Sequence, residues 1–228
     1  ILGIDLNPNH VGLSVLLYNN PNFKIIKTLS YDISKLTGKK DNHNKLKYEI
    51  IEISKRIINY CQYNHIKYIG LEQLKINGKD NQKGKNYNSL VNNKWLRTLL
   101  TEQLEKRAKL YNILVLKVLP YYSSYIGNLQ HDYVDEINAS IEVARRCYDV
   151  FILKNKDKFY PNFSIKEKLI RQWKDCIDFD IVKEWKELFS LIKNLELRYR
   201  VSLSECEHSY KVLRNNSDKS RTNLYVFV

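Results

Sequence analysis

The spacing of apolar residues changes along this chain, and the change limits the folds that it can adopt. Three apolar runs, Ile1–Leu6, Val11–Tyr18 and Phe23–Ile33, alternate in part with polar residues and are separated by turns rich in Asn and Pro. This pattern predicts three strands joined by tight turns. From about Asn44 to Tyr63 the apolar residues recur every three or four positions, which predicts a helix whose one apolar face packs on the sheet.

The alternation of strands and helices continues to about residue 150. Ile66–Leu74 is typical of a buried strand, Ser89–Tyr111 of a long helix and Asn112–Leu119 of another strand. We expect a loop over Tyr121–Gln130, because its residues favour turns, and a final helix from about Tyr133 to Asp149. The order β-β-β-α-β-α-β-α predicts an α/β fold, a mixed five-stranded sheet with helices on both faces.

Residues 151–228 show a different pattern. Ile165–Lys174 and Ile181–Leu195 have helical periodicity, and Asn223–Val228 is typical of a short strand. We therefore predict a first domain over residues 1–150 and a mostly helical C-terminal extension over residues 151–228.

The composition favours an anionic partner. The chain has 38 basic and 25 acidic side chains, a net charge of +13, which suits nucleic acid or an acidic membrane surface. The four cysteines include no C-x-x-C pair, which argues against a disulfide framework or a compact zinc site and indicates a reducing compartment. No apolar run reaches the ~20 residues of a membrane span, so we expect an intracellular protein without a membrane partner.

Two acidic residues interrupt apolar strands. Asp5 lies in the first predicted strand and Glu72 in the fourth, where a charge is costly unless it is paired or bound to a cation. These strands are neighbours in the expected sheet, so both carboxylates can emerge at one edge. Asp135 opens the last predicted helix, within reach of the same edge. Three carboxylates repel one another unless a dication is present, and oxygen ligands suit Mg²⁺ or Mn²⁺. Two such ions catalyse phosphodiester hydrolysis.

At these residues the sequence resembles a known family. Three segments are similar, in order and context, to the RuvC motifs of transposon-encoded TnpB proteins and type V CRISPR effectors: Ile1–Asn7, Ile69–Leu74 and Asp135–Ser140. The resemblance covers most of Ile1–Tyr148. It implies an RNase H-like fold and Mg²⁺-dependent DNA cleavage, and leaves a guide RNA open as a second partner. The family usually carries zinc-ribbon cysteines after the fifth strand, but Ser123–Asn128 has none, so we expect no zinc ribbon.

The third carboxylate has alternatives. Family spacing counted back from Asn138 falls on Glu136, whereas Asp135 lies one residue earlier and Asp132 one helical turn before that. Helical geometry turns Glu136 about 100° away from Asp135. We favour Asp135, because its short arm suits tight metal coordination, and keep Asp132 and Glu136 as alternatives.

Other residues are candidates for contact with DNA. Lysines 75, 79, 83 and 85 follow Glu72 in a polar segment, and lysine clusters bind phosphates without regard to sequence. A solvated loop without function is an equally good interpretation of Lys75, Lys79, Lys83 and Lys85. Ser123 and Ser124 have no evident His or Asp partners for nucleophilic catalysis, so we predict phosphate contact for them. Asn7 is expected to form a turn.

The sequence thus predicts a divalent-metal-dependent DNA endonuclease. The alternatives are a guide-free resolvase specific for Holliday junctions or flaps, and a nucleic-acid-binding module of the same fold without catalysis. The chain begins at Ile1 and contains no Met, so we expect an upstream segment or methionines that are not written out. We also expect the 228 residues alone to act without a guide, because holding a heteroduplex of ~20 base pairs needs more surface. No sequence feature sets an oligomeric state.

Overall fold

A computed structural model describes residues 1–19, 22–36, 43–73 and 96–154 and, further along the chain, residues 165, 167–173, 177–180, 182 and 185–199. Over this part of the chain the elements follow the order that the sequence predicted, with one additional helix after the fifth strand. None of the described helices combines the length and the apolar character that crossing a membrane requires.

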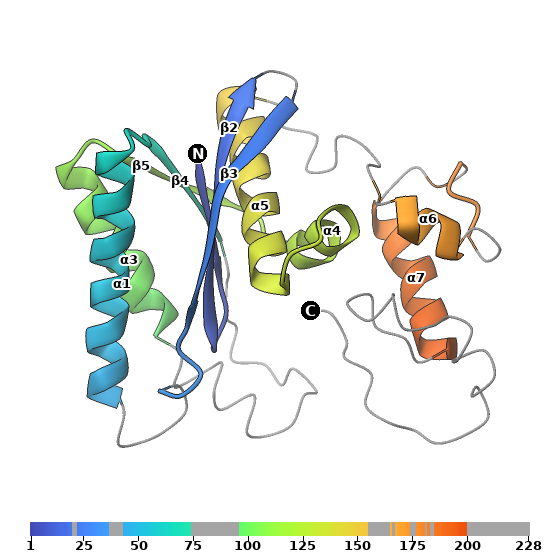
Figure 1. Cartoon of the computed structure of the whole chain (residues 1–228), viewed down its shortest axis with the longest axis horizontal. Helices are drawn as coiled ribbons and strands as arrows, with labels where there is room; N and C mark the ends of the chain where they lie inside the picture. The colour runs from blue at the N-terminus through green and yellow to red at the C-terminus, as the bar shows by residue number, and fades with distance from the viewer. Residues whose placement is uncertain are drawn as a thin grey trace.

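The described strands form one mixed sheet in the order β3-β2-β1-β4-β5. The first three strands pair antiparallel, and β1, β4 and β5 run parallel (Figure 1). The predicted five-stranded mixed sheet is therefore confirmed. Its strands are β1 (Leu2–Leu6), β2 (His10–Asn19), β3 (Asn22–Asp32), β4 (Tyr68–Glu72) and β5 (Leu114–Val118).

Helices cover both faces of the sheet, as predicted (Figure 1). On one face, α1 (His43–Tyr63) and α3 (Arg97–Leu110) pack over the largest apolar cluster of the molecule. On the other face, α5 (Asp135–Cys147) crosses β1 and β2 and continues into one turn of π-helix, Tyr148–Ile152. This arrangement is an RNase H-like α/β fold, with β1 buried along its whole length at the centre.

Glycines allow α5 to lie unusually close to the sheet. A Cβ atom at Gly3 would lie 2.0 Å from the Ser140 carbonyl oxygen, and one at Gly70 would lie 2.5 Å from the sulfur of Cys147. At Gly12 it would lie 2.2 Å from the backbone oxygen of Glu136. These distances are shorter than any real contact, so the helix approaches three strands only because each lacks a side chain there.

The prediction of a loop over Tyr121–Gln130 is wrong, because α4 (Ser123–Gln130) forms there. Its Ser, Gly and Asn residues suggested turns, but tertiary packing overrides that preference. Gly127 brings α4 against α5, where an added Cβ would lie 2.3 Å from the Asn138 carbonyl oxygen. Ile126 and Leu129 are fully buried, so α4 gains its stability from the contact rather than from local propensity.

The C-terminal extension contains the two predicted helices, α6 (Glu167–Trp173) and α7 (Trp185–Tyr199). Both helices lie beyond α4 (Figure 1), and their buried tryptophans share an apolar cluster with Tyr125, Ile126 and Leu129 of α4. The strand expected over Asn223–Val228 lies outside the described residues. The division at residue 150 stays a prediction.

Candidate active site

The register of the parallel strands brings Asp5 and Glu72 to the same level. In the pairing of β1 with β4, Gly3 lies opposite Gly70 and Ile4 opposite Leu71, so the next position on each strand carries a carboxylate. Side chains alternate between faces along a strand, which places both acids on the face of the two glycines. That face is the one that α5 covers. The local sequence thus sets two carboxylates side by side under a helix.

The third predicted acid, Asp135, begins α5 at the same edge. Its carboxylate accepts a hydrogen bond of 2.6 Å from the amide of Asn128 on α4. Asn128 in turn accepts a hydrogen bond of 2.8 Å from the side chain of Asn138, one turn further along α5. The amide oxygen of Asn138 also accepts from the backbone N–H of Tyr133. Two buried asparagines therefore hold the start of α5 and the carboxylate of Asp135 in place.

Burial and mutual repulsion control the charge state of the three acids. Asp5 is only 6% exposed; burial raises its pKa well above the ordinary value, and the carboxylates of Glu72 and Asp135 raise it further. Burial likewise raises the pKa of Glu72 and the pKa of Asp135. The residue Asp135 is exposed as a whole, but its carboxyl group is partly shielded from water. The structure thus places Glu72 and Asp135 close enough to Asp5 for their charges to raise its pKa.

Among the described residues, neutral groups form hydrogen bonds to these carboxylates. The amide of Asn7 lies 3.5 Å from Asp5, and the hydroxyl of Ser123 donates to Glu72. The charges of Arg146 and Arg97 also lower the pKa of Glu72, but burial outweighs these effects. Among the described residues, the three carboxylates therefore keep raised pKa values at the sheet edge, a condition that a bound cation would relieve.

Ser123 has a role that the sequence analysis did not predict. The side chain is buried, and its hydroxyl lies against both the Glu72 carboxylate and the Pro120 carbonyl oxygen. It orients the carboxylate from the turn that follows β5. Phosphate contact by Ser123 and Ser124 stays a prediction.

The alternatives for the third carboxylate lie in different surroundings. Glu136 accepts a hydrogen bond of 2.8 Å from Ser30 and lies 3.8 Å from the ring nitrogen of His10. Its side chain is therefore turned towards β2 and β3, although its charge still raises the pKa of Asp5. Asp132 is exposed in the segment before α5. The geometry favours Asp135 over both, and the choice stays a prediction.

The donor set fits a hard dication by its chemistry. Carboxylates are the ligands that Mg²⁺ and Mn²⁺ prefer, and a bound dication would relieve the repulsion by which Glu72 and Asp135 raise the pKa of Asp5. Within the part of the chain that the structure describes, no three His, Cys, Asp or Glu side chains are grouped closely enough to hold an ion as they stand. Asp5, Glu72 and Asp135 would have to move towards one another to share one.

The turn predicted at Asn7 is confirmed. Its side-chain oxygen accepts hydrogen bonds from the backbone N–H groups of His10 and Asn9, at 2.8 and 3.1 Å. Because the same side chain approaches Asp5 through its amide nitrogen, the turn between β1 and β2 also fixes one neighbour of the first carboxylate.

A pocket of about 220 Å³ opens beside Glu72. It lies between the ends of β4 and β5 and the start of α3. Three carboxylates and two cations line it, with Lys117 paired to Glu105. This balance disfavours phosphate binding, so the pocket does not extend the site to a DNA strand. Its lining residues are Glu72, Gln73, Arg97, Thr98, Thr101, Glu102, Glu105 and Lys117.

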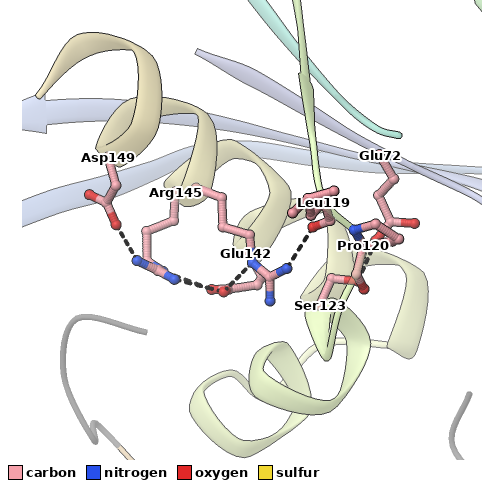
Figure 2. Close-up of polar contacts among 8 residues, drawn as sticks. Glu72, Leu119, Pro120, Ser123, Glu142, Arg145 and Asp149 are labelled. Atoms are coloured by element: carbon pink, nitrogen blue, oxygen red, sulfur yellow. Dashed lines mark hydrogen bonds and ion pairs between the residues drawn. The ribbon is translucent and has the colours of Figure 1, made fainter. Parts of the chain in front are cut away.

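A second group of buried charges lies further along α5, and the sequence analysis did not find it. Glu142 is fully buried between two guanidinium groups, accepting hydrogen bonds of 2.7 Å from Arg145 and 2.8 Å from Arg146. Arg145 also pairs with Asp149 (Figure 2). Burial alone would raise the pKa of Glu142, but the two arginines outweigh it and the pKa is lowered. We call these four residues the α5 ion cluster.

The lysines predicted to bind DNA, Lys75, Lys79, Lys83 and Lys85, lie outside the described residues. Their role stays a prediction.

Comparisons with known proteins add a likeness of architecture. No protein-family model and no curated protein sequence matches the chain. The structure is similar to that of Thermus thermophilus RuvC, with 10% sequence identity and a TM-score of 0.43 over 66% of this chain and 95% of that one. A structure of T. thermophilus RuvC in complex with a Holliday junction substrate matches at the same identity and TM-score, over 68% and 95%. At these values the likeness carries no argument about function.

Proposed function

We propose that the chain is a divalent-metal-dependent DNA endonuclease that acts without a guide RNA on branched or single-stranded DNA. The observation that carries the proposal is the approach of Glu72 and Asp135 to Asp5 at one edge of the sheet, where their charges and burial raise its pKa. Buried carboxylates of this kind are costly to the fold, so a function that requires them is the simplest explanation. The net charge of +13 favours a polyanionic substrate.

In this proposal Asp5, Glu72 and Asp135 hold Mg²⁺ or Mn²⁺, as a pair of ions. When bound, two such ions activate a water molecule and stabilise the leaving oxygen of a phosphodiester. The protein's own part is positioning: Asn7, Ser123 and Asn128 donate hydrogen bonds to the three carboxylates. The resemblance to TnpB proteins and type V CRISPR effectors supports the same chemistry. We propose guide-free action for these 228 residues by themselves, because holding a heteroduplex of ~20 base pairs needs a large basic surface.

The experiment compares Asp5→Asn, Glu72→Gln and Asp135→Asn with wild type on junction, flap and plain duplex substrates, with Mg²⁺ and with EDTA. We expect cleavage to fall by at least ~10³-fold in each variant, because an acid that binds the metal cannot be replaced by an amide. DNA binding, measured by fluorescence anisotropy, should change little. The matched control is Glu167→Gln, which removes an exposed carboxylate from α6.

Each alternative gives a different result in the same assay. If Glu136→Gln abolishes cleavage and Asp135→Asn does not, the third ligand is Glu136. Wild type that binds DNA but cleaves no substrate with Mg²⁺ or Mn²⁺ would establish the binding module without catalysis. Recovery of one discrete RNA from the purified protein, able to direct cleavage to complementary DNA, would contradict guide-free action.

A further inference from the structure

We propose that Arg146 is a positioning residue for the active site: it binds the backbone at the end of β5 and so holds Glu72 at a fixed place relative to Asp135. This inference rests on the proposed function. It starts from the α5 ion cluster, which takes no direct part in the chemistry proposed above.

Arg146 connects two elements that both touch the site. One nitrogen of its guanidinium donates a hydrogen bond of 2.8 Å to Glu142, and another donates one of 2.8 Å to the carbonyl oxygen of Leu119. Leu119 is the first residue after β5. The following residue, Pro120, accepts from the backbone N–H of Ser123, and its carbonyl oxygen lies 3.2 Å from the Ser123 hydroxyl oxygen. The Ser123 hydroxyl donates to Glu72, which completes a path of hydrogen bonds and backbone from α5 to the carboxylate.

Figure 2 shows this path from one end to the other. Glu142 and Arg145 lie on α5 and Asp149 on the π-helical turn that continues it. Leu119 and Pro120 follow β5, and Ser123 begins α4, with Glu72 beyond the serine hydroxyl. The path ends at a carboxylate on β4, whereas Asp135 stands at the start of α5 itself. Asp135 and Arg146 are eleven residues apart, about 16 Å along a helix. One rigid helix thus carries one acid and restrains another.

The turn that Arg146 holds contains a strained residue. Tyr122, directly before Ser123, has a left-handed backbone with φ of 59°. A residue with a side chain pays about 1 kcal/mol or more for this conformation and keeps it only where its surroundings enforce it. The hydrogen bond to the Leu119 carbonyl supplies such a restraint at the start of the turn.

Stability alone does not explain the buried arginine. Arg146 is 1% exposed, and replacing buried ion pairs by apolar side chains of similar volume is often neutral or stabilising. A fold that needed only packing here would be served by Leu or Met. Rigid hydrogen bonds to a turn that touches a catalytic carboxylate are a use that an apolar side chain cannot fulfil.

Arg145 offers a matched control. It is buried on the same helix and shares the carboxylate of Glu142, and it also pairs with Asp149, whereas the bond to Leu119 comes from Arg146. Arg146→Met and Arg145→Met therefore remove the same charge from the same cluster, and only the first releases Leu119. The variants are compared at a temperature at which circular dichroism shows both to be folded.

Three measurements are made on each variant. Amide hydrogen exchange over residues 119–124 reports on the turn, titration of Mn²⁺ without DNA reports on the carboxylates, and steady-state cleavage separates kcat from KM. For Arg146→Met we expect faster exchange in the turn, with Mn²⁺ affinity and kcat each lowered about 10–100-fold, as for residues that orient metal ligands. KM should change little. Arg145→Met should leave the turn and the Mn²⁺ affinity as in wild type, and Arg146→Lys should restore part of kcat.

A double variant tests whether Arg146 acts on Glu72 through Ser123. If Arg146 acts through Ser123, Arg146→Met combined with Ser123→Ala should be no worse in kcat than the poorer single variant, because both remove one path. Equal losses of kcat and Mn²⁺ affinity in Arg146→Met and Arg145→Met, or additive losses in the double variant, would overturn the inference and leave the proposed function standing. Wild type that neither cleaves DNA nor binds Mn²⁺ would instead overturn the proposed function and this role of Arg146 with it.

Discussion

The two ends of α5 carry opposite kinds of buried charge. At its start, Asp135 meets Asp5 and Glu72, and neutral amides and a hydroxyl supply their hydrogen bonds. Towards its end, the carboxylates of Glu142 and Asp149 face two guanidinium groups, so the charges balance within one cluster. The comparison sets buried charge that is balanced within the protein against buried carboxylates whose pKa values are raised. In the proposed function a metal ion would compensate the second group.

The pKa values express the same contrast. Burial raises the pKa of Asp5 and neighbouring acids raise it further, whereas cations lower the pKa of Glu142 despite complete burial. Asp149 is intermediate, because burial raises its pKa more than Arg145 lowers it. Stability should therefore depend on pH in opposite directions at the two ends of one helix.

The largest effect on stability is expected from breaking the balanced cluster. Glu142→Gln leaves two buried guanidinium groups without their shared carboxylate, and removing one partner of a buried ion pair typically costs about 3–5 kcal/mol. Urea unfolding of the purified variant measures this loss. Glu167→Gln is the matched control, since it removes the acid of another Glu–Arg pair with the same i,i+4 spacing, but an exposed one. A Glu142→Gln variant as stable as the control would show that the cluster contributes nothing.

A smaller effect on the free energy of unfolding, of opposite sign, is expected from Asp5, at the end of α5 where the three carboxylates lie. Without metal, Asp5→Asn should stabilise the fold by about 1–3 kcal/mol at pH 7, because it removes a carboxyl group whose charged form is disfavoured by burial and by neighbouring acids. Wild type should gain stability on adding Mg²⁺, as a ligand of the folded state must confer, and the variant should not. Thermal unfolding with EDTA and with Mg²⁺ measures both. A metal-free variant less stable than wild type would contradict the contrast between the two ends.

The sign of the pH dependence sharpens this test. The pKa of Asp5 is higher in the folded chain than in the unfolded one, so stability falls as the pH rises from about 4, the unfolded value, through the folded value. Asp5→Asn should flatten this fall. Glu142, with a lowered pKa, contributes stability that is lost as the pH falls towards acid, and Glu142→Gln should flatten that limb instead. Asp32→Asn, at an exposed position on β3, should leave the fall above pH 4 unchanged.

The smallest effect on stability is expected from the lysines after Glu72. If Lys75, Lys79, Lys83 and Lys85 bind DNA phosphates, replacing all four by Ala should reduce the slope of log K against log[salt] by up to ~3–4 units. The metal-free pH dependence of unfolding should stay as in wild type. A steeper fall of stability with rising pH in this variant would mean that the lysines, rather than a metal ion, compensate the carboxylates, because their loss would raise the pKa of Asp5 further.

The sequence predicted the sheet and the three carboxylates for a clear physical reason. A charged residue within an apolar strand is conspicuous, and parallel strands bring their carboxyl ends to one edge. Asp5 and Glu72 could therefore be placed from the order of elements alone. The hydrogen bonds that orient them, from Ser123 and Asn128, depend on how α4 packs and have no such signal.

The sequence analysis missed the α5 ion cluster because the spacing of its residues is typical of an exposed helix face rather than of buried charges. Asp135, Asn138, Glu142, Arg145 and Asp149 follow one another at intervals of three or four, and a polar stripe at helical spacing usually faces solvent. Here α4 helps to cover the stripe. Since the segment of α4 was expected to be a loop, the sequence offered nothing to bury these residues. One wrong element thus concealed a second group of buried charges.

The glycines beneath α5 give the protein an uneven tolerance to substitution. Gly3, Gly12 and Gly70 carry no chemistry, yet a single methyl group at any of them would act as a wedge between helix and sheet. Such a wedge would tilt Asp135 away from Asp5 and Glu72 while every reactive side chain was still present. Variants of this kind would be expected to stay folded and lose activity together with metal affinity. The distance between the carboxylates thus depends in part on three positions of the sheet that have no side chain.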